Sequence, residues 1–360
     1  MAFAIWHRAL SATIWPKRNR GNGLLLDEKS LRFELARERM RVDRNRSPLA
    51  VLTIELPASR ATPADFDFLA RVLTRRLRIT DTIGFLAERQ VGVLLPDTSE
   101  TGAWKVASDI CSVYPVGHDR PNCEVFVYPQ DPTSRRERTP ETEPEPVEEN
   151  TATSMESLFA LPNPKWKRAI DVLGAMMGLV LSMPILAVAG IAIKLSSRGP
   201  IFYSQLREGL AGRRFRIYKL RTMQLGADQY QSTLREHSIQ DGPAFKMKND
   251  PRTTWVGHWL RATSLDELPQ FWNVLRGDMS LVGPRPLPVH ESIQCAPWQR
   301  QRLSVVPGMT CIWQVSGRSQ VSFEEWMRMD LQYVRRRSLL CDMSLLVSTA
   351  PAVVVSRGPR

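Results

Sequence analysis

The chain has 360 residues, enough for two or three ordinary domains, and 43% of them are hydrophobic, which excludes a wholly disordered protein. Its net charge is +12, and the excess lies in the C-terminal part: residues 159–360 hold 27 Lys and Arg against 14 Asp and Glu. Such an excess suits an anionic lipid, a nucleotide or a nucleic acid as partner. The five cysteines show no CxxC spacing and the five histidines no HExxH spacing, so neither a disulfide framework nor a zinc motif is indicated.

The N-terminal third predicts an α/β domain preceded by a short leader. Residues 1–24 are mildly apolar and irregular, without the successive regions of a signal peptide. From residue 25 to residue 128, charged amphipathic stretches alternate with runs of β-branched and aliphatic residues, which predicts helices packed on a sheet. We expect helices within residues 24–46, 65–79 and 101–114, and strands within residues 47–56, 90–98 and 123–129.

Residues 129–158 predict a disordered linker. Pro, Glu, Thr and Ser dominate this stretch, so it cannot bury enough apolar surface to offset the entropy lost on ordering. The sequence therefore divides into a leader at residues 1–24, an α/β domain at 25–128, the linker at 129–158 and a second domain at 159–360.

The longest apolar run, from Val172 to Ile193, has 22 residues and no charge. A helix of this length can cross a bilayer. Pro184 lies at its middle, however, where a proline removes a helix hydrogen bond. Lysine and arginine flank both ends, and positive charge favours the cytoplasmic face of a membrane. We therefore expect a re-entrant membrane helix at residues 169–195 that kinks at Pro184 and returns to the same side. The alternatives are a straight span and a buried core helix of a soluble protein.

A basic strand follows the apolar run. Lys219 and Arg221 flank Leu220, so both side chains are expected to face one side of this strand. Arginine binds phosphate oxygens in a bidentate manner, and fixed cations on one face suit a diphosphate. The same composition is equally typical of a solvated basic edge or of a contact with anionic lipid.

Two adjacent acids, Asp266 and Glu267, lie between Arg261 and a Gly-Pro-Arg-Pro turn whose prolines are expected to hold Arg285 in place. One interpretation is a capping box, because Ser264 is followed three residues later by Glu267. The other is phosphoryl transfer, in which carboxylates hold Mg²⁺ or a carboxylate attacks phosphorus. The two roles are compatible, since a helix N-terminus also favours anions.

Several long stretches resemble one family. They span about residues 167–355 and read KRAIDVLGAMMGLVLSMPIL, GPIFYSQLREG, FRIYKLRTM, DPRTTWVGHWLRATSLDELPQFWNVLRGDMSLVGPRPLP and VVPGMTCIWQVSGRS. In this order they resemble the bacterial sugar transferases that act as polyprenyl-phosphate hexose-1-phosphate transferases. The resemblance implies an α-rich α+β domain, monotopic on the cytoplasmic face of the bacterial inner membrane. It also implies that the re-entrant helix breaks at Pro184, close to Ser182.

The resemblance further implies the chemistry. A hexose-1-phosphate, from UDP-glucose or UDP-galactose in most related chains, passes to undecaprenyl phosphate, and UMP is released. Asp266 is the expected nucleophile, forming a phosphosugar-aspartyl intermediate, and Glu267 is its partner in Mg²⁺ binding and proton handling. The product begins an exopolysaccharide, a capsule or the O-antigen of lipopolysaccharide. The residues expected to meet phosphates or the nucleotide are Lys219, Arg221, Arg261, Arg285 and Arg318.

Residues 25–128 resemble a diguanylate-cyclase-type (GGDEF) domain in the order of their elements. The signature is degenerate, because AERQV at residues 87–91 stands in place of GGDEF. The resemblance therefore implies no cyclase activity. Just upstream, Arg78 and Asp81 match the RxxD spacing of that family's inhibitory site, which makes cyclic di-GMP one expected ligand. The alternative is a domain kept for homodimerisation or for docking a protein partner.

Two other classes of function are weighed against the transferase. The first is a catalytically inactive nucleotide-sensing or scaffolding protein of a polysaccharide assembly complex, which the intact Asp266-Glu267 pair and Gly-Pro-Arg-Pro turn disfavour. The second is a nucleic-acid binder, which would use basic stripes with stacking aromatics. Such a binder has no use for a long apolar segment interrupted by proline, so no nucleic acid is expected.

Overall fold

The structure is a computed structural model of the chain, and its compact part forms two units that we treat separately. The first unit comprises residues 25–129 and the second comprises residues 156–355. The leader and most of the linker lie outside the described residues. The residues that the structure describes are 25–57, 62–114, 120–129, 155–230, 234–247, 250–316 and 321–355.

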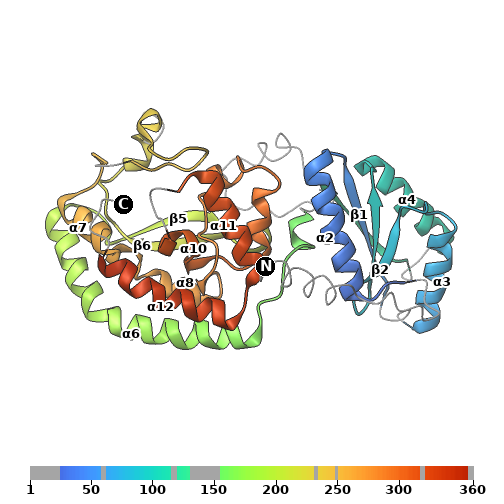
Figure 1. Ribbon diagram of the computed structural model, residues 1–360, viewed down its shortest axis with the longest axis horizontal. Helices are drawn as coiled ribbons and strands as arrows, with labels where there is room; N and C mark the ends of the chain where they lie inside the picture. Colours follow the sequence, from blue (N-terminus) through green and yellow to red (C-terminus); the bar gives the residue numbers. More distant parts are fainter. Residues whose placement is uncertain are drawn as a thin grey trace, which may run out of the picture. The chain divides into compact units, whose positions relative to one another are not determined.

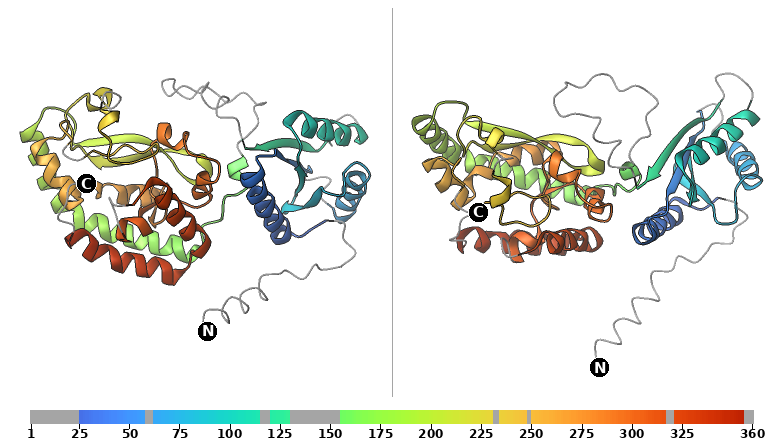
Figure 2. Two further views of the ribbon diagram at one scale, coloured as in Figure 1. Left: turned by 45° about the horizontal axis from the view of Figure 1, so that its top comes forward. Right: turned by 90° about the horizontal axis from the view of Figure 1, so that it is seen from above.

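The first unit is a four-stranded antiparallel sheet with helices on both faces (Figure 2). Helix α2 (Glu28–Asn45) covers one face, and α3 (Pro63–Thr74) and α4 (Glu100–Val113) cover the other. The prediction of helices on a sheet is confirmed. In spatial order the strands are β2 (Thr82–Ala87), β3 (Gln90–Pro96), β1 (Leu49–Glu55) and β4 (Asn122–Tyr128).

Strand β2 was not predicted, and Gly84 at its centre explains why. A glycine weakens the apolar pattern of a strand and often marks a place where another chain segment approaches closely. Here Leu26 forms a bridge with Gly84, and a Cβ at this glycine would lie 2.8 Å from the Leu26 side chain. The glycine therefore lets the segment at Leu26 lie directly beside β2. The same glycine interrupts the apolar pattern by which a strand is predicted.

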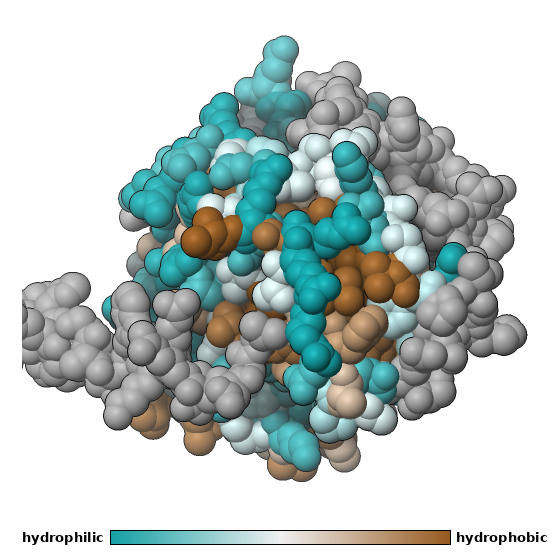
Figure 3. Space-filling model, turned by 90° about the vertical axis from the view of Figure 1, so that its right-hand side faces the viewer, coloured by the Kyte–Doolittle hydropathy of each residue, from teal (hydrophilic) through white to brown (hydrophobic). Residues whose placement is uncertain are grey.

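The core of the first unit lies between the sheet and the α3–α4 layer. Ala50, Leu52 and Ile54 alternate along β1 and are fully buried together with Leu69 of α3 and Ile110 of α4. On the face shown in Figure 3, hydrophobic residues are interrupted by hydrophilic ones. The large apolar side chains exposed on this unit include Phe33, Met40, Phe68, Ile79, Trp104 and Val113.

The second unit is α-rich with short β pairs, as expected (Figure 1). Its long helix α6 (Lys165–Ser196) is followed by an antiparallel hairpin of β5 (Phe202–Glu208) and β6 (Arg214–Leu220). A parallel pair joins β7 (Ser280–Val282) to β8 (Gly308–Thr310). The other helices are α7 (Trp255–Thr263), α8 (Gln270–Arg276), α9 (Val289–Ser292), α10 (Ile312–Ser316), α11 (Phe323–Arg336) and α12 (Leu339–Val355). Short 3-10 turns are η2 (Met155–Ser157), η3 (Leu210–Gly212), η4 (Ala227–Tyr230), η5 (Arg235–His237), η6 (Leu265–Glu267) and η7 (Gln299–Ser304).

Helix α6 runs without interruption through Pro184, and it bends along its length (Figure 1). A proline costs one hydrogen bond, which a bent helix tolerates, so the predicted kink takes the form of a bend in one continuous helix. Its return to the same side of a membrane stays a prediction. The Ser182 hydroxyl donates to the Leu179 carbonyl oxygen at 3.1 Å, just before the proline. Among the described residues α6 is the helix long and apolar enough to cross a membrane, and only 22% of its most apolar window is buried. A core helix of a soluble protein would be mostly buried.

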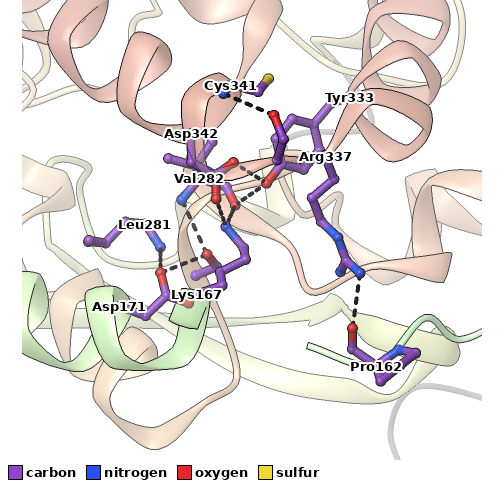
Figure 4. Close-up of polar contacts among 11 residues, drawn as sticks. Pro162, Lys167, Asp171, Leu281, Val282, Tyr333, Arg337, Cys341 and Asp342 are labelled. Atoms are coloured by element: carbon purple, nitrogen blue, oxygen red, sulfur yellow. Dashed lines mark hydrogen bonds and ion pairs between the residues drawn. The ribbon is translucent and has the colours of Figure 1, made fainter. Parts of the chain in front are cut away.

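A buried polar cluster ties the first turns of α6 to β7, α11 and α12 (Figure 4). The Lys167 ammonium donates to Asp342 at 2.5 Å and to the Val282 carbonyl oxygen at 3.0 Å. The Tyr333 hydroxyl donates to the other oxygen of Asp342 at 2.8 Å. Asp171 accepts two hydrogen bonds from β7, at 2.8 and 2.9 Å. The KRAID stretch thus fixes the start of α6 to the body of the second unit.

Candidate active site

The two acids lie in η6, between α7 and α8. Ser264 ends α7 with a left-handed backbone (φ 61°), and its N–H donates to the Arg261 carbonyl oxygen at 3.2 Å. An N-cap residue needs an extended backbone and a side chain that accepts from the next turn. Within the described chain the Ser264 hydroxyl has no hydrogen-bond partner, so the predicted capping box is wrong. The Glu267 side chain forms ion pairs with Lys219 and Arg285 instead.

Glu267 forms a double ion pair. It accepts from Lys219 Nζ at 3.0 Å and from both terminal nitrogens of Arg285, Nη1 at 3.2 Å. Burial alone would raise the pKa of Glu267, but Arg285 and Lys219 hold it well below its usual range. Glu267 is therefore a permanently ionised acceptor that orients two cations.

Asp266 is in the opposite condition. It is 7% exposed, and its carboxylate makes no hydrogen bond or ion pair with any residue that the structure describes. Burial raises the pKa of Asp266, an effect that the Lys219 charge opposes and the Glu267 charge reinforces. Arg261 and Arg285 also favour its ionised form. The site thus holds an uncommitted carboxylate surrounded by positive charge.

Asn273 of α8 places Lys219 opposite the acids. It is fully buried, its Nδ2 donates to the Arg216 carbonyl oxygen at 2.7 Å, and its Oδ1 accepts from the Tyr218 N–H at 3.1 Å. These two bonds join α8 to the end of β6, where Lys219 lies. Asn273 was not predicted from the sequence, although an amide within the apolar stretch QFWNVL is a signal of a buried polar contact.

Arg207 of β5 is a second site residue that was not predicted from the sequence. The hairpin register pairs Tyr203 with Lys219, so Arg207 lies on the same face as Lys219. Its Nη1 donates to the Pro286 carbonyl oxygen at 2.7 Å. Burial and the neighbouring Arg285 charge lower the pKa of Arg207 to about 10. The alternation of Tyr203, Gln205 and Arg207 was the available signal.

Arg261 reaches the site from α7. Its Nε donates to the Thr222 hydroxyl at 3.0 Å and its Nη1 to the Thr253 hydroxyl at 3.2 Å. Burial lowers the pKa of Arg261, and the Asp266 charge opposes that shift. Both hydroxyls are neutral, so Arg261 keeps its charge for Asp266 or for a bound anion.

The structure does not bring every predicted residue to this site. Arg221 follows the last residue of β6, and its Nη2 donates to the Ser197 carbonyl oxygen at 2.8 Å and to the Ser197 hydroxyl at 3.0 Å. Its Nη1 donates to the Arg198 carbonyl oxygen. Arg221 therefore binds the C-terminal end of α6. Arg318 lies outside the described residues. The predicted residues that do gather are Asp266, Glu267, Lys219, Arg261 and Arg285.

A metal site made by protein ligands alone is not found in the described chain, which holds no group of three or more His, Cys, Asp or Glu side chains. Asp266 has free acceptor oxygens, whereas the oxygens of Glu267 already meet Lys219 and Arg285. The donor set therefore fits a Mg²⁺ that is held by one carboxylate and by substrate phosphates.

The RxxD residues of the first unit do not form a ligand site here. The Asp81 carboxylate accepts from the Arg78 N–H at 2.7 Å and so closes a local turn. This local bond gives no support to cyclic di-GMP binding.

The sequence profile of the bacterial sugar transferase family matches residues 163–356, more than half of the chain, so the chain belongs to this family. It is 41% identical over 195 residues to the galactosyl transferase CpsE of Streptococcus agalactiae, covering 54% of this chain and 43% of CpsE. It is 40% identical over 204 residues to the exopolysaccharide production protein ExoY of Rhizobium meliloti, covering 53% of this chain and 87% of ExoY. The chain therefore spans less than half the length of CpsE but most of ExoY.

A third relative is the UDP-glucose:undecaprenyl-phosphate glucose-1-phosphate transferase of Caulobacter vibrioides, 41% identical over 200 residues, with 53% of this chain and 70% of that protein covered. Solved structures give a weaker likeness. A DGC protein from Thermotoga maritima is 13% identical with a TM-score of 0.27, covering 30% of this chain and 84% of that one. This score decides nothing about the fold, and the GGDEF-like assignment of residues 25–128 stays a prediction.

Proposed function

We propose that the chain transfers a hexose-1-phosphate, glucose or galactose, from a UDP-sugar to undecaprenyl phosphate. The observation that supports this most is Asp266, a buried carboxylate without a partner in the described chain and beside three cations. A nucleophile needs a free oxygen, and a diphosphate needs fixed positive charge. The relatives whose names state a reaction transfer galactose or a glucose-1-phosphate.

In the proposed first step, a carboxylate oxygen of Asp266 attacks the sugar-bearing phosphorus of the UDP-sugar. An O–P bond forms, the bond from that phosphorus to the bridging oxygen breaks, and UMP leaves with the electron pair. In the second step, an oxygen of undecaprenyl phosphate attacks the same phosphorus, and the Asp266 carboxylate is restored. The cations available to stabilise the phosphoryl oxygens are Lys219, Arg207, Arg261 and Arg285.

Mg²⁺ is the proposed cofactor, and Asp266 is the residue that fits as its ligand. Glu267 would join only by exchanging its ion pairs with Lys219 and Arg285. A bound Mg²⁺ would neutralise charge on the diphosphate of the donor. Chelation with EDTA is expected to stop UMP release, and added Mg²⁺ to restore it. Full activity in EDTA would exclude the cofactor.

We also propose that the second unit is a monotopic protein of the cytoplasmic face of the inner membrane. Helix α6 enters the bilayer, bends and returns toward the same side. Supporting this, α7 contacts α6 and exposes Trp255 and Trp259, which suit the headgroup level of a membrane. The exposed apolar residues of α6 include Leu173, Met176, Met177, Val180, Leu181, Met183, Val188, Ile191 and Leu195.

The test is UMP release from purified protein in nanodiscs, with undecaprenyl phosphate, Mg²⁺ and a panel of UDP-sugars. UMP is expected with one hexose donor and is expected to be lost in Asp266→Asn, which keeps the side chain's size but not its nucleophilic charge. Folded protein that releases no UMP with any donor would favour the remaining alternative, an inactive scaffold of a polysaccharide assembly complex.

A further inference from the structure

A second buried arginine holds the main chain of Arg285. Arg302 of η7 is 3% exposed, and its Nε and Nη2 lie 2.9 and 2.8 Å from Oδ2 of Asp330 on α11. The same Nη2 also donates to the carbonyl oxygen of Arg285. Three segments far apart in the sequence therefore meet at one guanidinium.

The side chain of Arg285 is fixed from the other end. Glu267 accepts from both of its terminal nitrogens. The Gln314 amide, oriented to satisfy both of its neighbours, accepts from Arg285 Nη1 at 2.9 Å and donates to the Met309 carbonyl oxygen at 3.1 Å. With its main chain bound by Arg302 and its side chain bound by Glu267 and Gln314, Arg285 has little freedom to move.

The turn that carries Arg285 is tightly packed against β8. It follows β7, and a Cβ added at Gly308 of β8 would lie 2.0 Å from the Gly283 nitrogen. The Gly308 N–H donates to the Pro284 carbonyl oxygen at 2.9 Å. A shift of Arg302 would therefore pass to the whole turn instead of being absorbed locally.

We propose that Arg302 and Asp330 are positioning residues for phosphosugar transfer, which set the place of the Arg285 guanidinium beside Glu267 and the diphosphate of the donor. This inference rests on the proposed function. Neither residue touches the reacting atoms; each acts through Arg285. A displacement of about 1 Å at a positioning group can cost up to about 100-fold in rate.

The protonation of Asp330 should make the reaction rate depend on pH, which an ion pair with a purely structural role would not do. Its Oδ1 is buried without a hydrogen-bond partner in the described chain, and burial raises the pKa of Asp330 to about 6 against the opposing charge of Arg302. The other titratable group near it is the Cys311 thiol, which stays neutral because burial raises its pKa. As pH falls through about 6, Asp330 gains a proton and its ion pair with Arg302 is lost, so turnover should fall.

Arg300 offers a matched control. It lies in the same η7 turn, is 5% exposed, and pairs with Glu156 at 2.5 Å and with Glu208 at 3.0 Å. The described chain shows no bond from Arg300 to Arg285. Its substitution removes a buried ion pair of the same kind but leaves the Arg285 turn untouched.

The experiment compares the full chain with Asp330→Asn, Arg302→Lys and Arg300→Met in nanodiscs. It measures kcat and KM for the UDP-sugar from pH 5 to 9, and thermal stability. Asp330→Asn is expected to lower kcat by about 10- to 100-fold with little change in KM. It is also expected to remove the part of the acid loss that Asp330 causes near pH 6, and to leave the part that protonation of Asp266 causes. Arg302→Lys keeps the charge but not the planar fork, so an intermediate kcat is expected. Arg300→Met is expected to lower the melting temperature while its kcat stays that of the wild type.

Three results would overturn the inference, and they can be told apart. Active wild-type protein with an unchanged kcat and pH profile in Asp330→Asn and Arg302→Lys would overturn the positioning role alone. Wild-type protein that releases no UMP would overturn the proposed function together with this inference. Equal kcat losses in Asp330→Asn and Arg300→Met would mean that any buried ion pair matters, and would also overturn it.

Discussion

Two carboxylates that are neighbours in the chain have opposite surroundings. Glu267 meets Lys219 and Arg285 directly, and their charges hold its pKa well below the usual range. Asp266 is buried without such a bond in the described chain, and burial raises its pKa. Pairs of titratable groups whose pKa values are pushed apart are typical of a division of roles. Here the division is between an ionised group that orients cations and a free group that can react.

The raised pKa of Asp266 predicts the pH dependence of the reaction. Only the ionised carboxylate is a nucleophile, so UMP release should rise as pH rises through that pKa. The Lys219 charge opposes the shift, so Lys219→Met should raise the pKa of Asp266 further and move the acid limb to higher pH. The measurement is a pH–rate profile of UMP release for both proteins.

The control for this prediction is Lys219→Arg, which keeps the positive charge and should keep the acid limb near its wild-type position. A limb that stays in place in Lys219→Met would mean that the Lys219 charge does not act on the nucleophile. Because Lys219 also binds Glu267, the position of the limb is the informative quantity, more than the absolute rate.

Arg221, predicted to bind a phosphate, instead joins the end of β6 to the end of α6. Its guanidinium donates three hydrogen bonds to the residues that follow α6. We expect Arg221→Met to lower the free energy of unfolding by about 1–3 kcal/mol, because buried acceptors lose their donors. The KM for the UDP-sugar should change by less than about twofold. Thermal melting measures the predicted loss of stability, and steady-state kinetics measure the KM. A large rise in KM with unchanged stability would mean that Arg221 binds the phosphates of the donor after all.

The exposed side of α6 predicts how the second unit holds to a membrane. Val180 and Leu181 are 69% and 66% exposed on this helix. Replacing both by lysine should cost about 2.5–3.5 kcal/mol per residue if they lie in the bilayer. We expect the double variant to lose flotation with phospholipid vesicles. Ile239→Lys, at an exposed apolar residue outside α6, should float like the wild type. Flotation of the double variant would contradict insertion of α6.

At the scale of the whole molecule, the sequence predicted what depends on local pattern. Alternating apolar runs located β1, β3 and β4, and uncharged length located α6. The sequence did not predict site residues whose place depends on contacts between segments far apart in the chain. Arg207 joins the site only through the register of the β5–β6 hairpin, and Asn273 only through its bonds to β6. The capping box predicted at Ser264 does not form, because the serine has a left-handed backbone. A Ser-x-x-Glu spacing carries no information on that backbone angle.

The boundary between the two units yields a last prediction. The family match begins at residue 163, yet Glu156 lies before it and pairs with the buried Arg300 of the second unit. A chain of residues 155–360 keeps this pair and should keep the UMP release of the full chain. A chain of residues 163–360 leaves Arg300 with Glu208 alone, and should lose about 1–3 kcal/mol of unfolding free energy.

That loss corresponds to a melting temperature lower by roughly 2–12 °C for a domain of this size. Scanning fluorimetry of the two truncated chains, with Glu156→Gln in the longer one as control, measures it. Equal melting temperatures would mean that residues 155–162 contribute nothing to the stability of the second unit. A lower value in both the short chain and Glu156→Gln would instead place the folding boundary of the second unit before residue 163, where the family match begins. The second unit would then begin within the turn that carries Glu156.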